Sequence, residues 1–221
     1  MEILNEHINN ILQQLPPDIT LVAVTKTRPV EILEQAYKIG LRDFGENRVQ
    51  EIIEKQPLLP PDIRWHMIGH LQTNKVKFIA PFVRMIHSVD SLKLLEEINR
   101  QALKVNRTID CLLQVHIATE ESKFGLDEIE IRSLLDSDVF KSMANIRICG
   151  MMGMATFSDD LSLVRGEFSG LKLLFEEIKQ QYFQQSDFFK ILSMGMSGDY
   201  QTAIEEGSTM VRIGTALFGE R

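Results

Sequence analysis

Residues 21–26, LVAVTK, form a short apolar run rich in β-branched side chains that ends in a lysine, and Thr27-Arg28-Pro29 follows at once. Such a run predicts a buried strand, because β-branched side chains fit a pleated surface and proline cannot continue a central strand. A lysine at the exit of a buried strand is costly to desolvate unless its amine is used, so Lys26 is a candidate for Schiff-base chemistry. The run therefore predicts both a strand and a reactive residue.

Helical patterns lie on both sides of this strand. Residues 1–15 place apolar side chains at helical spacing until Pro16-Pro17 stops the pattern, which predicts a leading amphipathic helix. After the strand, Pro29 suits the first turn of a helix and Gly40 suits its end. The first repeating unit is therefore a strand followed by a helix.

The same alternation continues to the end of the chain. Further strands are predicted at residues 43–45, 64–68, 84–88, 109–117, 146–152, 191–194 and 210–213, with helical patterns at 91–105, 127–135, 161–183 and 200–206. Short apolar strands separated by helices are typical of an α/β fold with a parallel sheet, and eight units favour a closed (β/α)8 TIM barrel. No shift in composition marks a linker, so we expect residues 1–221 to form one barrel domain with an extra N-terminal helix.

Composition excludes several classes of function. A net charge of −7 with scattered lysines and arginines gives no basic surface for nucleic acid. The sequence has neither a signal-peptide layout nor an apolar stretch of the roughly 18 residues that a membrane span needs, so we expect a cytoplasmic protein that binds no membrane. Cys111 and Cys149 lie in apolar runs without metal-ligand spacing, which favours two buried hydrophobic side chains over a disulfide or a metal site.

Small and hydroxyl residues gather after the last two predicted strands. Residues 193–198 read SMGMSG, and Gly214-Thr215 follows the eighth strand. In (β/α)8 barrels the loops after strands seven and eight often hold a phosphate, and small residues let backbone N–H groups approach an anion. Ser193, Ser197, Gly214 and Thr215 are therefore candidates for a phosphate site. Arg212 on the eighth strand needs an acceptor such as a ring nitrogen or a phosphate, or an ion pair with Asp90.

Three further polar residues follow the second and third strands. Asn47 could present its amide to the barrel mouth, but its segment could also be a helix start in which Glu46 complements the helix dipole. His66 and His70 lack the context of a metal pair. We expect His70 to line the mouth and His66 to be a packed core histidine.

Five ordered motifs together resemble one known family. These motifs are residues 21–27, 44–51, 66–75, 192–197 and 211–219, and they resemble the YggS/PROSC family of pyridoxal phosphate homeostasis proteins. That family is similar to the N-terminal barrel of alanine racemase. The resemblance implies that pyridoxal 5′-phosphate (PLP) is the cofactor and that Lys26 holds it as an aldimine. It further implies that Ser193, Ser197, Gly214 and Thr215 take the phosphate, that Arg212 faces the pyridine nitrogen, and that Asn47 lies beside the ring.

The resemblance also implies a role in vitamin B6 homeostasis. Alanine racemase uses a tyrosine base from a second domain and partner subunit, and we expect this chain to supply no such group. The primary hypothesis is therefore a monomeric, non-catalytic protein that binds PLP, influences amino-acid and keto-acid balance, and delivers the cofactor to PLP-dependent apoenzymes. The alternative is a monomeric PLP-dependent amino-acid racemase, and a third hypothesis is a cofactor-free barrel aldolase that uses the same lysine.

Overall fold

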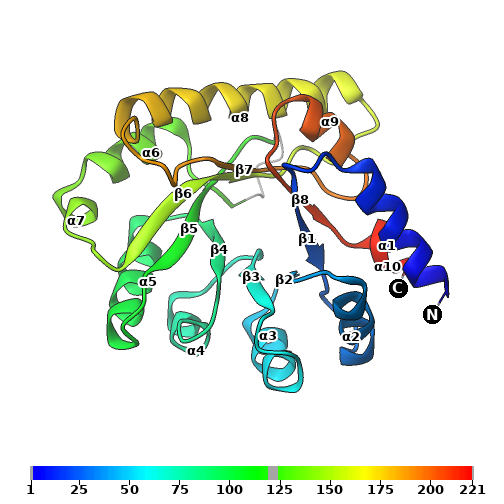
Figure 1. Ribbon diagram of the computed structural model, residues 1–221. Helices are drawn as coiled ribbons and strands as arrows, with labels where there is room; N and C mark the ends of the chain where they lie inside the picture. Colours follow the sequence, from blue (N-terminus) through cyan, green and yellow to red (C-terminus); the bar gives the residue numbers. More distant parts are fainter. Residues whose placement is uncertain (1, 119–123, 221) are drawn as a thin grey trace.

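The computed structural model describes residues 2–118 and 124–220. Within them, eight parallel strands close into a barrel in sequence order, with β1 beside β8 (Figure 1). The strands are β1 (Thr20–Val24), β2 (Asp43–Glu46), β3 (Arg64–Met67), β4 (Met85–Val89), β5 (Ile109–Val115), β6 (Ile146–Gly153), β7 (Ile191–Ser193) and β8 (Met210–Ile213). The predicted (β/α)8 barrel is confirmed.

Helices surround these strands, and the first helix lies against the last, so that both ends of the described chain meet on one side (Figure 1). The helices are α1 (Glu2–Gln14), α2 (Val30–Ile39), α3 (Val49–Lys55), α4 (Val76–Ile79), α5 (Leu92–Lys104), α6 (Glu128–Asp136), α7 (Asp138–Lys141), α8 (Leu161–Tyr182), α9 (Tyr200–Glu205) and α10 (Thr215–Phe218). Two 3-10 turns, η1 (Gln56–Leu58) and η2 (Thr73–Lys75), precede β3 and α4. In the described residues, no helix combines the length and the apolarity that crossing a membrane requires.

Strand alternation creates two cores, because successive side chains point to opposite faces of a strand. Outward side chains such as Phe44 and Trp65 pack with the helices in a large apolar cluster. A smaller cluster includes Val22, Met85, Leu112, Cys149, Met152 and Met210, which fill the barrel interior. Cys111 and Cys149 are both buried and unpaired, as the sequence predicted.

The predicted and observed elements differ mainly at their ends. Strand ends agree within two residues, and β8 has the predicted bounds. The leading helix begins at Glu2, and Met1 lies outside the described residues. The four-residue helices α4, α7 and α10 were not predicted, because about one turn is too short to show a helical period, and of α3 only a helix start near Glu46 was considered.

Candidate functional site

Barrel closure brings most of the predicted site residues to one end of the molecule. Lys26 follows β1, Asn47 follows β2, Ser197 follows β7, and Gly214-Thr215 follows β8. Because β1 pairs with both β2 and β8, and β7 pairs with β8, these exits are neighbours around the rim. The carboxyl ends of the strands are where reactive groups lie in this fold. We call this end the mouth.

A buried polar cluster holds the backbone on both sides of Lys26. The Lys55 ammonium donates to the Thr25 carbonyl at 2.9 Å and pairs with Glu46 Oε1 at 2.7 Å and Glu51 Oε2 at 2.9 Å. The Thr25 hydroxyl donates to Glu46 Oε1 at 2.6 Å, and the Thr27 N–H donates to Glu51 Oε2 at 2.6 Å. Thr27 has a positive φ of 63°, which an L side chain adopts only with such support. The cluster therefore fixes where Lys26 leaves the strand.

The position of Glu46 does not agree with the interpretation that its segment is a helix start. It is the last residue of β2 and fully buried, and α3 begins only at Val49 after the N-cap Arg48, so Glu46 does not complement the dipole of a helix start. Burial raises the pKa of Glu46 to about 7, against hydrogen bonds from Lys55 and Thr25 that lower it. The roles of Glu46, Glu51 and Lys55 were missed by the sequence reading, although a Glu four residues before a Lys on one helix is a recognisable pair.

The backbone of Asn47 is held by close contact with the loop after β3. A Cβ atom at Gly69 would lie 2.4 Å from the Asn47 carbonyl oxygen, so only glycine allows this approach. The Asn47 side chain is half-buried at the β2 exit. Asn47 therefore lies at the mouth, on the strand next to the one that Lys26 follows.

The loop after β7 reaches across to the end of β8. The Ser197 hydroxyl oxygen accepts hydrogen bonds from the N–H groups of Gly214 and Ala216, both at 3.2 Å. Gly195 starts this loop with a φ of +96° and lies where a Cβ would be 2.6 Å from the Ala203 Cβ. The structure thus joins the two segments from which the sequence predicted a phosphate site, with Thr215 exposed beside them.

Arg212 lies on the inner face of β8 and is 3% exposed. Its guanidinium donates to the carbonyls of Ser193 at 2.8 Å and Gly153 at 3.0 Å, and to the Ser193 hydroxyl at 2.7 Å. Burial lowers the pKa of Arg212 to about 10, and nearby Asp199 opposes this, so the group stays cationic at neutral pH. Asp90 pairs with His70 in the described structure, so the ion pair considered between Arg212 and Asp90 is not formed.

Ser193 lies deeper than the other predicted phosphate residues. Its side chain is fully buried, and its hydroxyl lies 2.7 Å from an Arg212 nitrogen and 3.3 Å from His87 Nδ1. His66, expected as a packed core histidine, is indeed buried, but both its ring nitrogens have polar partners. The hydroxyl of Ser193 therefore supports Arg212 from inside the barrel.

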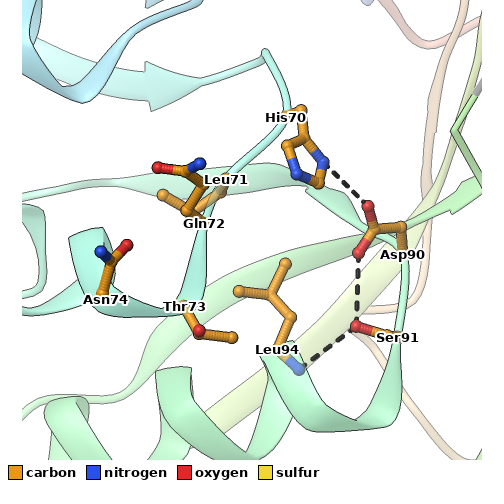
Figure 2. Close-up of a pocket in the computed structure, with 8 residues that line it drawn as sticks. All are labelled: His70, Leu71, Gln72, Thr73, Asn74, Asp90, Ser91 and Leu94. Carbon is orange, nitrogen blue, oxygen red and sulfur yellow. Dashed lines mark hydrogen bonds and ion pairs between the residues drawn. The ribbon is translucent and has the colours of Figure 1, made fainter.

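A polar pocket of about 380 Å³ lies beside the exits of β3 and β4. Figure 2 shows Asp90 between His70 and Ser91, with His70 Nδ1 3.1 Å from Asp90 Oδ2 and the Ser91 hydroxyl capping α5 at Leu94. The His70 ring also stacks on Phe124, with centroids 4.2 Å apart. His70 thus lines the rim, as predicted, but its pocket contains none of the proposed cofactor residues.

The tyrosine hydroxyls lie away from the mouth, and the acidic side chains form no metal site in the described residues. The hydroxyls of Tyr37, Tyr182 and Tyr200 donate to Asp62, Asp136 and Gln14, on the outside of the barrel. Across residues 2–118 and 124–220, no cluster of three or more His, Cys, Asp or Glu side chains could hold a metal ion.

The donor set fits a phosphorylated aldehyde with a ring nitrogen. Three hydrogen bonds leave at least two of the five N–H groups of Arg212 without a partner among the described residues, so this cation can donate to one more acceptor. Lys26 provides an amine that can react with an aldehyde, and the Ser197 loop provides a hydroxyl beside backbone amides. The amine, the cation and the amide-rich loop are carried by three neighbouring strands.

Sequence comparison places these residues in a wider set of proteins. Residues 1–221 match the family described as alanine racemase, N-terminal domain. The chain is 40% identical over 202 residues to the pyridoxal phosphate homeostasis protein of Aquifex aeolicus (strain VF5), covering 91% of this chain and 86% of that protein. It is 38% identical over 232 residues to the human pyridoxal phosphate homeostasis protein, covering 98% of this chain and 84% of the human one.

Solved structures agree with the sequence comparison. PipY of Synechococcus elongatus PCC7942, solved with PLP bound, is 36% identical and superposes with a TM-score of 0.89, covering 98% of this chain and all of PipY. Alanine racemase of Clostridium difficile 630 is 17% identical and superposes with a TM-score of 0.77. The superposition covers all of this chain and 56% of the racemase, so the two proteins share the fold.

Proposed function

This chain belongs to the family of pyridoxal phosphate homeostasis proteins, and from that premise we propose that it holds PLP through Lys26 at the barrel mouth and releases it without turning over a substrate. The observation that carries the proposal is the grouping of Lys26, Arg212 and the Ser197 loop on three neighbouring strands. The whole of residues 1–221 would serve as one cofactor-binding domain.

Each residue has a distinct task in this proposal. Lys26 would bind the aldehyde covalently, and the cluster around Lys55 would keep the lysine backbone in place. The Ser197 hydroxyl with the backbone of Gly214 and Thr215 would bind the phosphate, and Asn47 would lie beside the ring. Ser193 would act through Arg212, since its hydroxyl is already bonded to that guanidinium.

Two features favour storage over catalysis. PLP supplies an electron-withdrawing ring, and a cationic donor such as Arg212 at the ring nitrogen keeps that nitrogen unprotonated and weakens this pull. Racemisation also needs proton transfer on both faces of the bound substrate, and the three tyrosine hydroxyls donate elsewhere. Both features support a carrier over the racemase alternative.

The deciding experiment is the visible absorption of the purified protein with added PLP, compared with Lys26→Ala and with the surface control Lys104→Ala. We expect a yellow band in the parent and in Lys104→Ala, and none in Lys26→Ala. Incubation with alanine in heavy water should leave its α-proton in place. Sustained exchange that depends on Lys26 would replace the carrier by the racemase, and a parent that takes up no PLP would favour the aldolase.

Three expectations stay predictions. These are a cytoplasmic location, a monomeric state, and delivery of PLP to PLP-dependent apoenzymes. Mixing the loaded protein with a PLP-dependent apoenzyme tests the last one, because delivery should restore the activity of the apoenzyme faster than the same concentration of free PLP does. Restoration at the rate of free PLP would argue against direct transfer.

A further inference from the structure

Four buried side chains and the partly buried Asp43 form one continuous hydrogen-bonded network through the barrel interior, which we call the interior network. They are Asp43 on β2, His66 on β3, His87 on β4, Ser193 on β7 and Arg212 on β8. His66 Nε2 lies 3.0 Å from Asp43 Oδ1, and His66 Nδ1 lies 2.9 Å from His87 Nε2. His87 Nδ1 lies 3.3 Å from the Ser193 hydroxyl, which lies 2.7 Å from Arg212. The network connects the amino end of β2 to the mouth.

The two ends of the network limit the directions that its hydrogen bonds can take. A guanidinium only donates, and an ionised carboxylate only accepts. Although burial alone would raise it, the pKa of Asp43 is lowered to about 2 by hydrogen bonds from Arg64 and His66, so Asp43 is a carboxylate at neutral pH. The network therefore has a fixed acceptor at Asp43 and a fixed donor at Arg212.

With both imidazoles neutral, only one arrangement of protons satisfies each contact. The Ser193 oxygen accepts from Arg212, so its own proton is directed to Nδ1 of His87. His87 then carries its proton on Nε2 and donates it to Nδ1 of His66. His66 likewise carries its proton on Nε2 and donates it to Asp43. In this arrangement both imidazoles have the same tautomer.

Burial agrees with this arrangement. His87 is fully buried, and burial, with a smaller contribution from the Arg212 cation, lowers its pKa well below the usual range. The two imidazole rings are inclined at 71° with centroids 5.1 Å apart, which accommodates the 2.9 Å contact between their nitrogens. A second proton on His87 would lie on Nδ1 and would force the Ser193 hydroxyl to turn its own proton away.

We propose that His66 and His87 are positioning residues of the cofactor site, which orient the Ser193 hydroxyl and through it hold the Arg212 guanidinium that would meet the ring nitrogen of PLP. The inference rests on the proposed function for its ligand. It assigns a task to two histidines that do not reach the mouth.

The first test needs no cofactor. Long-range ¹H–¹⁵N correlation spectra of the PLP-free protein report which imidazole nitrogen carries the proton. We expect His66 and His87 to be neutral with the proton on Nε2 at pH 7, and the Ser193→Ala variant to change the His87 signal. A proton on Nδ1 of either ring, or a charged ring at pH 7, would overturn the directed network.

The second test measures the loaded protein. His87→Leu keeps a side chain of similar size but removes both hydrogen bonds, whereas His87→Gln keeps an amide that donates and accepts. We expect His87→Leu to shift the visible band and to weaken PLP retention roughly 10- to 100-fold. The reason is that the Ser193 hydroxyl, which accepts a hydrogen bond from the charged Arg212, would lose its orientation. His87→Gln should recover part of both properties, and His7→Gln on α1 should match the parent.

The outcomes separate the inference from the function it builds on. If the parent binds PLP and a folded His87→Leu keeps the parental band and retention, the positioning role is refuted while the carrier remains. If the parent itself takes up no PLP, the proposed function fails, and the spectra of the PLP-free protein still decide the network. Should His87→Leu not fold, His66→Gln serves in its place with the same expected direction.

Discussion

Replacing Asp43 by asparagine should make the protein less stable by an amount that depends on pH. The Asp43 side chain is 12% exposed, and its pKa falls from an ordinary 3.8 to about 2 in the folded protein through Arg64 and His66. Each pKa unit corresponds to about 1.4 kcal/mol, so the charged carboxylate contributes about 2 kcal/mol to the free energy of unfolding. Because the folded pKa is depressed, this contribution is complete well above pH 3.8 and is lost as pH falls towards 2.

Urea denaturation of the parent and Asp43→Asn between pH 7 and pH 3 measures this directly. The difference in unfolding free energy should be nearly constant from pH 7 to pH 5 and fall to about half at pH 3. Asp62→Asn is the control, because Asp62 forms an exposed ion pair with Arg42 that contributes little. Equal stabilities at pH 6, or a difference that does not change with pH, would refute an ionised, hydrogen-bonded Asp43.

Two further substitutions test the supports of the mouth. Lys55→Met leaves the Glu46 carboxylate buried without its cation, which should lower the free energy of unfolding by about 3 kcal/mol at pH 8. The loss should be smaller at pH 5, because Glu46, whose folded pKa is about 7, is protonated there. Urea midpoints that differ equally at both pH values would contradict this. Gly195→Ala places a Cβ 2.6 Å from Ala203 and 2.9 Å from Tyr200 at a φ of +96°. The substitution should therefore lower the free energy of unfolding by about 3 kcal/mol and loosen the loop after β7. An unchanged melting temperature would speak against this.

The interior network shows why part of the site was hidden in the sequence. His66 was predicted as a core histidine from strand alternation alone, and its burial agrees with that prediction. Its partners are 21 residues away at His87 and 23 residues away at Asp43, and Ser193 is 106 residues from His87. No local pattern connects these positions, because the contacts depend on which side chains point inward after the barrel closes.

The cluster around Lys26 illustrates the same limit at shorter range. Lys55 appears in the sequence as one more charge on a helix, yet it is 7% exposed and bonded to the Thr25 carbonyl 30 residues earlier. Its burial follows from the packing of α3 against the exits of β1 and β2. A charged residue of a short helix is ordinarily assigned to the solvent.

The sequence by itself determined the class of fold and the place of the candidate lysine at a strand exit, because strand and helix periods and the positions of proline and glycine are local properties. It placed eight strands in order and put Lys26 and Arg212 at the ends of two of them. The tertiary structure decided which polar groups meet. Closure of β1 onto β8 sets the strand register, and register determines the inward neighbours of Arg212, Ser193 and His87. Hydrogen bonds act over about 3 Å, so these partners exist only once the barrel is closed.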